Sequence, residues 1–191
     1  MRFFYALAIS AARCVVPLVA RSTKAKAFVH GRKDVWKKLE SIPKDAKVVW
    51  MHCASLGEYE QGLPVLQGLK ASNPDYFYLV TFFSPSGYEV RNAHGVADLT
   101  TYLPWDTNKE VQRFVSRVNP KMALFVKYEF WPTVIAALHN ASVPIYLIAG
   151  QFRSQQVFFK PWGSSYRKLL KGFRHLFVQN EQSLKLLQQI G

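Results

Sequence analysis

Two carboxylates of this chain stand where they could do chemistry. Glu58 follows a strand-forming run, VVWMHCA, and a turn of sequence SLG, whose small residues leave space for another molecule beside the carboxylate. Glu129 follows a second apolar run and lies between Lys127 and two large aromatic residues. A carboxylate that stays ionised yet partly desolvated in a cleft can act as a general base. We therefore expect general-base chemistry at Glu58 and single out Glu129 as a second candidate.

Structural roles compete with these interpretations. A glutamate in the first turn of a helix is stabilised by the helix dipole by up to ~1 kcal/mol, and Pro64 suits such a turn because proline is tolerated there. Glu129 could pair with a lysine at the surface, an interaction that contributes little. His52 and Cys53 look like a base and a thiol nucleophile. Neighbours on a strand point to opposite faces, so we do not expect them to act together.

The composition limits the classes of partner. The chain has 191 residues, of which 49% are hydrophobic and 15% aromatic, so it can bury one core, or one core with an appendage. Its 25 Lys and Arg residues against 12 Asp and Glu give a net charge of +13, which favours nucleic acid, anionic lipid or a phosphorylated substrate as partner. Its two cysteines, Cys14 and Cys53, form no CxxC pair. This argues against a disulfide framework and a structural zinc site, and it fits a reducing compartment.

Strand-like and helical patterns alternate along most of the chain, after a short amphipathic helix expected at 33–43. The strand-like apolar runs lie at 47–53, 76–83, 99–103, 121–126, 144–149 and 174–178. The helical patterns lie at 61–71, 86–93, 107–117, 130–140, 155–171 and 180–190. This alternation predicts an α/β fold, a Rossmann-like parallel sheet with helices on both faces. Ligands of such sheets bind at the carboxyl ends of the strands, so the loops after the strands are where we expect a site.

Those loops lack the common phosphate-binding signatures. Neither GxGxxG nor GxxxxGK[ST] occurs, so a dinucleotide site and a P-loop have no phosphate cradle. The SPSG turn at 84–87 leads into a helix expected near Ser86 and could offer backbone N–H groups to a phosphate or a carboxylate. A serine that only caps the helix is the alternative, and it is the more common arrangement.

The start of the chain is membrane-seeking. Residues 3–20 form an apolar run that is interrupted by Arg13 and Pro17 and followed by several Lys and Arg residues. A cleaved signal peptide fits poorly because no good small-x-small site follows. A charge near a bilayer centre disfavours a full span, whereas a tilted or half-inserted anchor with its basic flank in the cytoplasm tolerates it. An ordinary apolar helix packed on the protein stays open as an alternative.

Four motifs then occur in order along the chain: ASLGEYEQGLP, TFFSPSGYEVR, VKYEFWPT and FVQNEQS. In these motifs and their separations the chain, from about residue 25 to its end, resembles the N-terminal domain of the 3-deoxy-D-manno-octulosonic acid (Kdo) transferases of lipopolysaccharide biosynthesis. The resemblance implies the N-terminal half of a GT-B glycosyltransferase. Such an inverting enzyme transfers Kdo from CMP-Kdo to a lipid A precursor at the cytoplasmic face of the inner membrane. It implies no metal and no cofactor besides the donor substrate.

The resemblance also implies roles for single residues. Glu58 of the SLGE motif matches the family's proton acceptor, and Glu129 of the EFWP motif matches a glutamate that helps to stabilise the transition state. The matching acceptor-site loops contain Ser55, Gly57, Ser84, Ser86, Gly87 and Lys127. We expect a membrane-anchor helix with its basic flank at 1–24 and an acceptor-binding domain at 25–191.

Members of this family are roughly twice as long as this chain, in line with two domains of typical size. The domain that binds CMP-Kdo would lie beyond Gly191, so transfer is expected only when that domain is supplied. The expected partners are a lipid A precursor and an anionic membrane surface, with no nucleic acid. A basic rim would contact the lipid: Lys127, Arg153, Lys160, Arg167, Lys168 and Lys171, with Phe158, Phe159 and Trp162 dipping into the interface. The alternative function is a non-catalytic basic α/β module that binds anionic lipid or nucleic acid.

Overall fold

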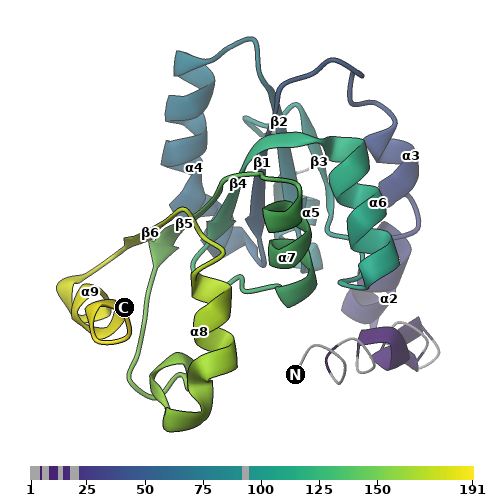
Figure 1. Cartoon of the computed structure of the whole chain (residues 1–191). Helices are drawn as coiled ribbons and strands as arrows, with labels where there is room; N and C mark the ends of the chain where they lie inside the picture. Colours follow the sequence, from purple (N-terminus) through teal and green to yellow (C-terminus); the bar gives the residue numbers. More distant parts are fainter. Residues whose placement is uncertain (1–4, 6–8, 13–14, 18–21, 92–94) are drawn as a thin grey trace.

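A six-stranded parallel sheet forms the centre of the molecule (Figure 1). The computed structural model describes residues 5, 9–12, 15–17, 22–91 and 95–191. The strands are β1 (Val48–Cys53), β2 (Phe77–Phe82), β3 (Leu99–Tyr102), β4 (Pro120–Val126), β5 (Ile145–Gly150) and β6 (His175–Val178). Their order is β3-β2-β1-β4-β5-β6, so the winding reverses between β1 and β4, as in a Rossmann fold. The six predicted strands and the predicted α/β fold class are confirmed.

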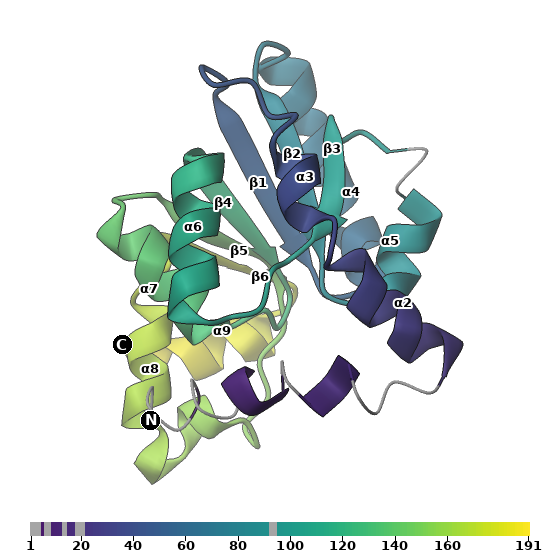
Figure 2. The ribbon, with the colours of Figure 1, turned by 90° about the vertical axis from the view of Figure 1, so that its right-hand side faces the viewer.

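Helices cover both faces of this sheet, as the alternating pattern predicts. The α-helices are α2 (Thr23–Gly31), α3 (Val35–Leu39), α4 (Leu56–Ser72), α5 (Pro85–Arg91), α6 (Asn108–Val118), α7 (Pro132–Asn140), α8 (Ser164–Leu170) and α9 (Glu181–Gln188). Figure 1 shows α4 on one side of the sheet and α3, α6 and α7 on the other. Figure 2 shows α2 beside α5, near the carboxyl ends of the strands.

Alternate residues of the strands pack into two apolar layers. Trp50, Phe125 and Leu147 belong to the layer that α3, α6 and α7 cover. Met51 and Leu124 belong to the other layer, which packs against α4. Every residue of β1 is buried. Because both faces of β1 are covered, its sequence is a nearly continuous apolar run rather than an alternating one.

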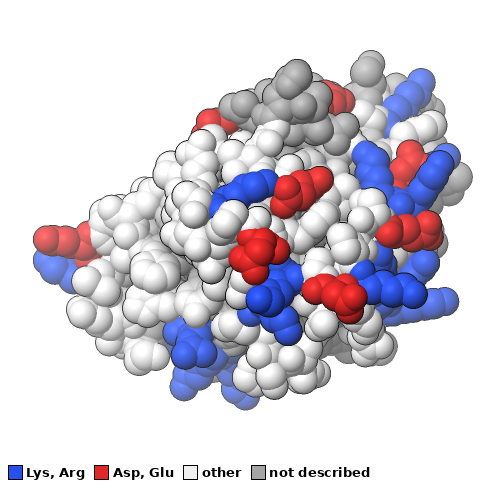
Figure 3. All heavy atoms as spheres, turned by 90° about the horizontal axis from the view of Figure 1, so that it is seen from above, with Lys and Arg blue, Asp and Glu red and all other residues white. Residues whose placement is uncertain are grey.

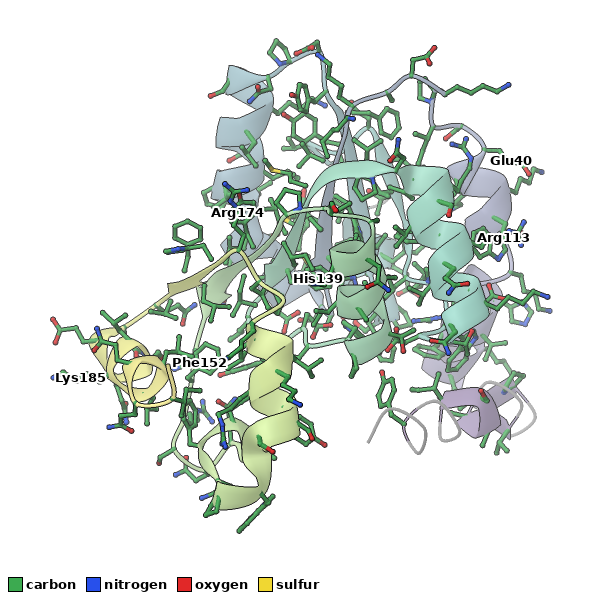
Figure 4. All side chains as sticks on the ribbon, in the orientation of Figure 1. Glu40, Arg113, His139, Phe152, Arg174 and Lys185 are labelled. Atoms are coloured by element: carbon green, nitrogen blue, oxygen red, sulfur yellow. The ribbon has the colours of Figure 1, made fainter. Side chains whose placement is uncertain are left out.

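The short helix α3 is held against α6 by arginine side chains of α6. Arg113 extends from α6 toward α3 (Figure 4), and its guanidinium lies 3.8 Å from the centre of the Trp36 ring. Arg117 donates a hydrogen bond of 2.8 Å to the carbonyl of Ile42, just beyond α3. The amphipathic helix expected at 33–43 therefore exists, although it is shorter than expected.

Two helical predictions are wrong in part. The pattern at 155–171 forms two 3-10 turns, η1 (Val157–Phe159) and η2 (Pro161–Gly163), followed by α8, instead of one helix. Proline lacks an N–H and disfavours helical backbone in the residue before it, which explains the break at Pro161. Helix α4 begins at Leu56 rather than at residue 61, so Pro64 lies in the helix interior and not in its first turn.

The anchor predicted at 1–24 falls mostly on residues outside the described part of the chain. Within the described residues, no helix is both long enough and apolar enough to cross a membrane.

The face at the amino ends of the strands mixes both signs of charge. Figure 3 shows this face from above, with acidic side chains interspersed among basic ones. Lys47 lies 3.5 Å from Asp75, and Lys70, in the last turn of α4, lies 2.7 Å from Asp98. An anionic ligand therefore meets no uniformly positive surface here, whereas ligands of such sheets bind at the opposite, carboxyl edge.

Candidate active site

The loops after β1 and β2 are joined by backbone hydrogen bonds at the carboxyl edge of the sheet. The N–H of Ser84 donates to the carbonyl of Ala54 at 2.8 Å, and the N–H of Phe83 donates to the carbonyl of Cys53 at 3.2 Å. Because β4 pairs with β1 on its other side, the loop that carries Glu129 lies at the same edge. The three loops predicted to carry the site are therefore neighbours at the point where the strand order reverses.

Glu58 lies in the first turn of α4, and its carboxylate folds back onto the loop after β1. Its Oε2 accepts a hydrogen bond of 2.5 Å from the backbone N–H of Ala54. Burial raises the pKa of Glu58 above its usual value, and the negative charge of Glu129 raises it further. The Ala54 N–H and the charge of Lys127 act on this pKa in the opposite direction. Glu58 thus holds a proton more readily than a free glutamate does, which favours a role as base.

Glu129 is held by ring nitrogens of His52 and Trp131. It follows β4 and is only 8% exposed. Its Oε2 lies 3.0 Å from Nε2 of His52, on β1, and accepts a hydrogen bond of 2.6 Å from the indole N–H of Trp131, at the start of α7. A surface pair with a lysine, the alternative considered from the sequence, is therefore not the arrangement found.

His52 continues these contacts into the sheet. Its Nδ1 lies 2.8 Å from the hydroxyl and 3.1 Å from the carbonyl of Thr81, which stands opposite it on β2. The same hydroxyl accepts a hydrogen bond of 2.8 Å from the indole N–H of Trp50. Sequence reasoning missed this chain of contacts, because it considered His52 only as a partner of Cys53. The sequence signal that could have indicated these contacts is the presence of a histidine within the apolar run of β1.

Cys53 lies apart from His52, as predicted from their adjacent positions on a strand. The thiol belongs to the apolar layer under α4, whereas His52 contacts Trp50 and Glu129. Burial raises the pKa of the Cys53 thiol well above its usual value, and the charges of Glu58 and Glu129 add to this effect. A thiol kept protonated in this way is a poor nucleophile.

The predicted acceptor-binding residues of the first loop border Glu58. Ser55 is the extended residue before α4, and its side chain does not cap the helix. Gly57 is exposed in the first turn, with open space where a side chain would stand. No neighbouring atom in the described structure requires a glycine at this position, whereas a molecule approaching Glu58 would benefit from the space.

The predicted residues of the second loop lie at the start of α5. The hydroxyls of Ser84 and Ser86 are 2.8 Å apart and hydrogen-bonded to each other. Gly87 has a steric reason to be glycine, because a Cβ there would lie 2.2 Å from the ring of Phe82. Of these three residues, the two serines are the ones with polar groups for a ligand.

Lys127, the last predicted acceptor-binding residue, adopts an unusual backbone conformation directly after β4. Its φ is 67°, in the left-handed region that side chains larger than glycine rarely adopt. Its N–H donates to the carbonyl of Ile148 at 2.9 Å, which ties this loop to β5. Its charge is close enough to Glu58 to lower the pKa of that carboxyl. Strained backbone of this kind is concentrated at functional sites.

Asp106 is a further carboxylate of this edge that sequence reasoning missed. It is 2% exposed and follows β3. It accepts hydrogen bonds from the backbone N–H groups of Thr133 at 3.4 Å and Val134 at 3.1 Å, and from the hydroxyl of Tyr5 at 2.7 Å. Burial raises the pKa of Asp106 to about 6. Asp106 thus caps α7, whose own N-terminal residue Trp131 provides no side-chain cap, and it steadies the loop that carries Glu129.

Fold and site together define a Rossmann-like α/β domain with two dissimilar carboxylates at the switch-point edge, where such sheets bind their ligands. Within the described ranges, no group of His, Cys, Asp and Glu residues is arranged to hold a metal ion.

The chain belongs to the family described as 3-deoxy-D-manno-octulosonic-acid transferase (Kdo transferase), whose profile matches residues 25–191. This confirms the resemblance drawn from the four motifs. A Kdo transferase of Chlamydophila psittaci is 28% identical over 181 residues, which are 87% of this chain and 40% of that protein. One from Aquifex aeolicus is 35% identical over 97 residues, 50% of this chain and 27% of that protein. One from Rickettsia felis is 26% identical over 148 residues, 75% of this chain and 31% of that protein. The chain thus spans less than half the length of these relatives.

A solved structure supports the fold. A Listeria monocytogenes protein described as a "putative UDP-N-acetylglucosamine 2-epimerase" superimposes with a TM-score of 0.55 over 75% of this chain and 42% of its own. The two sequences are 10% identical, so this likeness concerns the α/β architecture alone.

Proposed function

We propose that this chain is the acceptor-binding domain of an inverting Kdo transferase in which Glu58 is the general base. Such an enzyme transfers Kdo from CMP-Kdo to a lipid A precursor in lipopolysaccharide biosynthesis. Membership of the Kdo transferase family supports the substrate class. The observation that carries the chemistry is the contrast between the two carboxylates. Glu58 has a raised pKa and a backbone N–H partner, whereas Glu129 is held by two ring nitrogens.

In the proposed reaction, Glu58 takes the proton of an acceptor sugar hydroxyl while that oxygen attacks the anomeric carbon of Kdo. The new C–O bond forms as the bond to the phosphate oxygen of CMP breaks, and CMP leaves with the electron pair. A single displacement of this kind inverts the configuration. Positive charge develops on the Kdo ring in the transition state, and the fixed negative charge of Glu129 would stabilise it.

The acceptor headgroup is proposed to lie against the three loops of the carboxyl edge. Ser55, Ser84 and Ser86 offer hydroxyls to its sugars, Lys127 offers a cation to a phosphate, and Gly57 leaves space beside Glu58. Binding of CMP-Kdo is assigned to a second domain of the GT-B type that faces this edge. The proposed transfer requires no metal ion and no cofactor.

We also propose that the protein acts at the cytoplasmic face of the inner membrane, held by its N-terminal segment and by an anionic lipid surface. The segment from η2 to α8 supports the second contact. Trp162 is 73% exposed and Tyr166 is 37% exposed, and Lys168 and Lys171 are exposed near them. Aromatic and lysine side chains in this arrangement suit the interface between headgroups and acyl chains.

Two members of the basic rim predicted from the sequence do not fit this role. Phe158 is 5% exposed and packs in the core, with its ring centre 4.9 Å from that of Phe130. Arg167 donates from one nitrogen to the carbonyls of Phe158 and Lys160, at 3.0 and 3.1 Å. These side chains close the turn between η1 and α8, so they are not available to lipid.

The deciding experiment joins this chain to the donor domain of a relative, such as the Aquifex aeolicus enzyme, and measures Kdo transfer from CMP-Kdo to a lipid A precursor. Glu58→Gln should lower kcat by about 10²- to 10⁴-fold, the usual contribution of a general base. Glu60→Gln is the matched control, at an exposed position of the same helix, and should keep the activity.

Undiminished transfer by the Glu58→Gln fusion would show that Glu58 takes no part in the chemistry.

The alternative function predicts a different set of results. If the fusion transfers no Kdo, and the chain instead binds single-stranded or duplex nucleic acid in a salt-sensitive manner without binding lipid A precursor, a basic binding module replaces the enzyme.

Sedimentation with vesicles that contain anionic lipid tests the membrane contact. The double variant Lys168→Glu, Lys171→Glu should bind these vesicles more weakly than the original chain. The matched control is Lys44→Glu, Lys121→Glu, which changes the net charge equally at exposed positions of the opposite end. Equal binding by the two double variants would show that only net charge matters and would rule out a specific contact through α8.

A further inference from the structure

A series of hydrogen bonds links Trp50 to Glu129 through Thr81 and His52. The donor of each bond can be identified from the chemistry of these groups. The indole of Trp50 can only donate, so the Thr81 hydroxyl oxygen accepts this bond at 2.8 Å. The hydroxyl must then give its own proton to an acceptor, and Nδ1 of His52 stands 2.8 Å away. A ring nitrogen that accepts a hydrogen bond carries no proton, so the proton of the neutral imidazole lies on Nε2.

The tautomer of His52 also determines how its ring contacts the Glu129 carboxylate. With its proton on Nε2, His52 donates to Glu129 Oε2 across 3.0 Å, and the indole of Trp131 donates to the same oxygen at 2.6 Å. Both donors therefore reach Oε2. In the described structure neither of these donors bonds to the other oxygen, Oε1, and we assign that oxygen to the substrate.

We propose that His52 is a positioning residue for Kdo transfer: Thr81 holds it as the Nε2–H tautomer, and in that form it fixes the Glu129 carboxylate with Oε1 directed at the reacting sugar. This inference rests on the proposed function, in which Glu129 stabilises the transition state. It adds to that function the side chains that make the carboxylate rigid.

The opposite tautomer fits the same contacts poorly. A proton on Nδ1 could reach the Thr81 carbonyl at 3.1 Å, but the Thr81 hydroxyl proton would then face an N–H group. Nε2 would turn a lone pair toward the Glu129 carboxylate. Trp50, His52 and Thr81 are all 0% exposed, so water cannot compensate either mismatch.

Nitrogen NMR of the chain labelled with 15N-histidine reads the tautomer directly. The signals of His52, identified by their loss in His52→Gln, should show an unprotonated Nδ1 and a protonated Nε2. Thr81→Ser keeps a hydroxyl and should keep this pattern, whereas Thr81→Val removes the hydroxyl and should shift the ring toward the other tautomer. A protonated Nδ1 in the unaltered chain overturns the proposal, whatever the enzyme activity.

A matched pair of substitutions at His52 tests the effect on the reaction and does not depend on the Thr81 variants. Glutamine places its amide nitrogen near the position of Nε2 and can still donate to Glu129. Asparagine places its amide nitrogen near Nδ1 and cannot. In the fusion with a donor domain, His52→Asn should lower kcat by about 10- to 100-fold with KM unchanged, by analogy with the loss of side chains that orient metal ligands. His52→Gln should keep most of the activity.

A role in packing alone would give the two variants the same kcat, and that result overturns the proposal. Failure of the proposed function has a different signature. In that case the unaltered fusion transfers no Kdo, while the NMR experiment still decides the tautomer of His52.

Discussion

The two carboxylates at the carboxyl edge are held in opposite ways. Glu58 sits at a helix start, and its backbone partner Ala54 belongs to the same short loop. Glu129 is held by His52 and Trp131, side chains that the fold brings together from β1 and the start of α7. A carboxylate with a raised pKa at a helix start can exchange a proton, whereas one held by two rings has a fixed position. The comparison teaches that two glutamates of one site differ in chemistry through their surroundings, because burial and a neighbouring charge raise the pKa of Glu58, whereas ring nitrogens of His52 and Trp131 position Glu129.

Replacing each carboxylate by its amide should change the stability of the chain in opposite directions. Glu129→Gln should lower the free energy of unfolding by about 3 kcal/mol, since a hydrogen bond to a charged group contributes roughly 1.5–3 kcal/mol and two such bonds are weakened. Urea unfolding near neutral pH measures this change.

Glu58→Gln is the counterpart and should not lower the stability. The folded state raises the pKa of Glu58, so the folded chain binds this proton more tightly than the unfolded chain does. The stability contributed by this group is therefore present at low pH and is lost as the pH rises through the raised pKa. Glutamine is neutral at every pH, so Glu58→Gln avoids this loss of stability at neutral pH. Equal destabilisation by the two amides would contradict this distinction between the two carboxylates.

Asp106 is a third carboxylate to compare. It is held by the first backbone N–H groups of α7 and by the Tyr5 hydroxyl, and not by ring nitrogens. Tyr5→Phe removes its hydroxyl donor and should lower the free energy of unfolding by about 1.5 kcal/mol at a pH where Asp106 is ionised. The pKa of Asp106 is raised to about 6, so its contribution to stability is lost as the pH rises through that value, and the Tyr5 hydrogen bond offsets part of this loss.

The difference between Tyr5→Phe and the original chain should therefore grow as the pH rises through about 6, which unfolding at several pH values measures. Tyr166→Phe, at a position that is 37% exposed, is the control and should change little at any pH. A Tyr5→Phe effect that does not vary with pH would mean that the hydroxyl does not act through the Asp106 carboxylate.

The fold was predictable to the extent that burial leaves a pattern in the sequence. Most strands are apolar runs because both faces of the sheet are covered, so they could be located from the sequence; β6 keeps an apolar character although its residues are half-buried or exposed. Helix ends were less predictable. The SLGE turn is itself the start of α4, and Pro161 divides a helical pattern into two 3-10 turns and α8, because local signals there compete with apolar periodicity.

The site was predictable in its carboxylates and not in their surroundings. Glu58 and Glu129 stand out because each directly follows a strand of a parallel sheet. Their partners could not be found in the same way, since Thr81 reaches Glu129 only through His52, and these three residues belong to β2, the loop after β4 and β1. The cap of α7 could not be predicted for the same reason. Asp106 belongs to the loop after β3, and only the folded sheet places it at Thr133 and Val134.

The smallest expected effect concerns the cation beside Glu58. Lys127 lowers the pKa of Glu58, so Lys127→Gln should let that pKa rise further above its usual value. In the fusion enzyme, the acid limb of the pH profile of kcat/KM should then move to higher pH, because Glu58 must lose its proton to act as a base.

Glutamine is no more strained than lysine at a φ of 67°, so the charge is the main difference between the two variants. Lys121→Gln, an exposed lysine at the start of β4, is the control and should leave the limb in place. If the limb did not move to higher pH in Lys127→Gln, the base would not be the carboxylate beside this lysine.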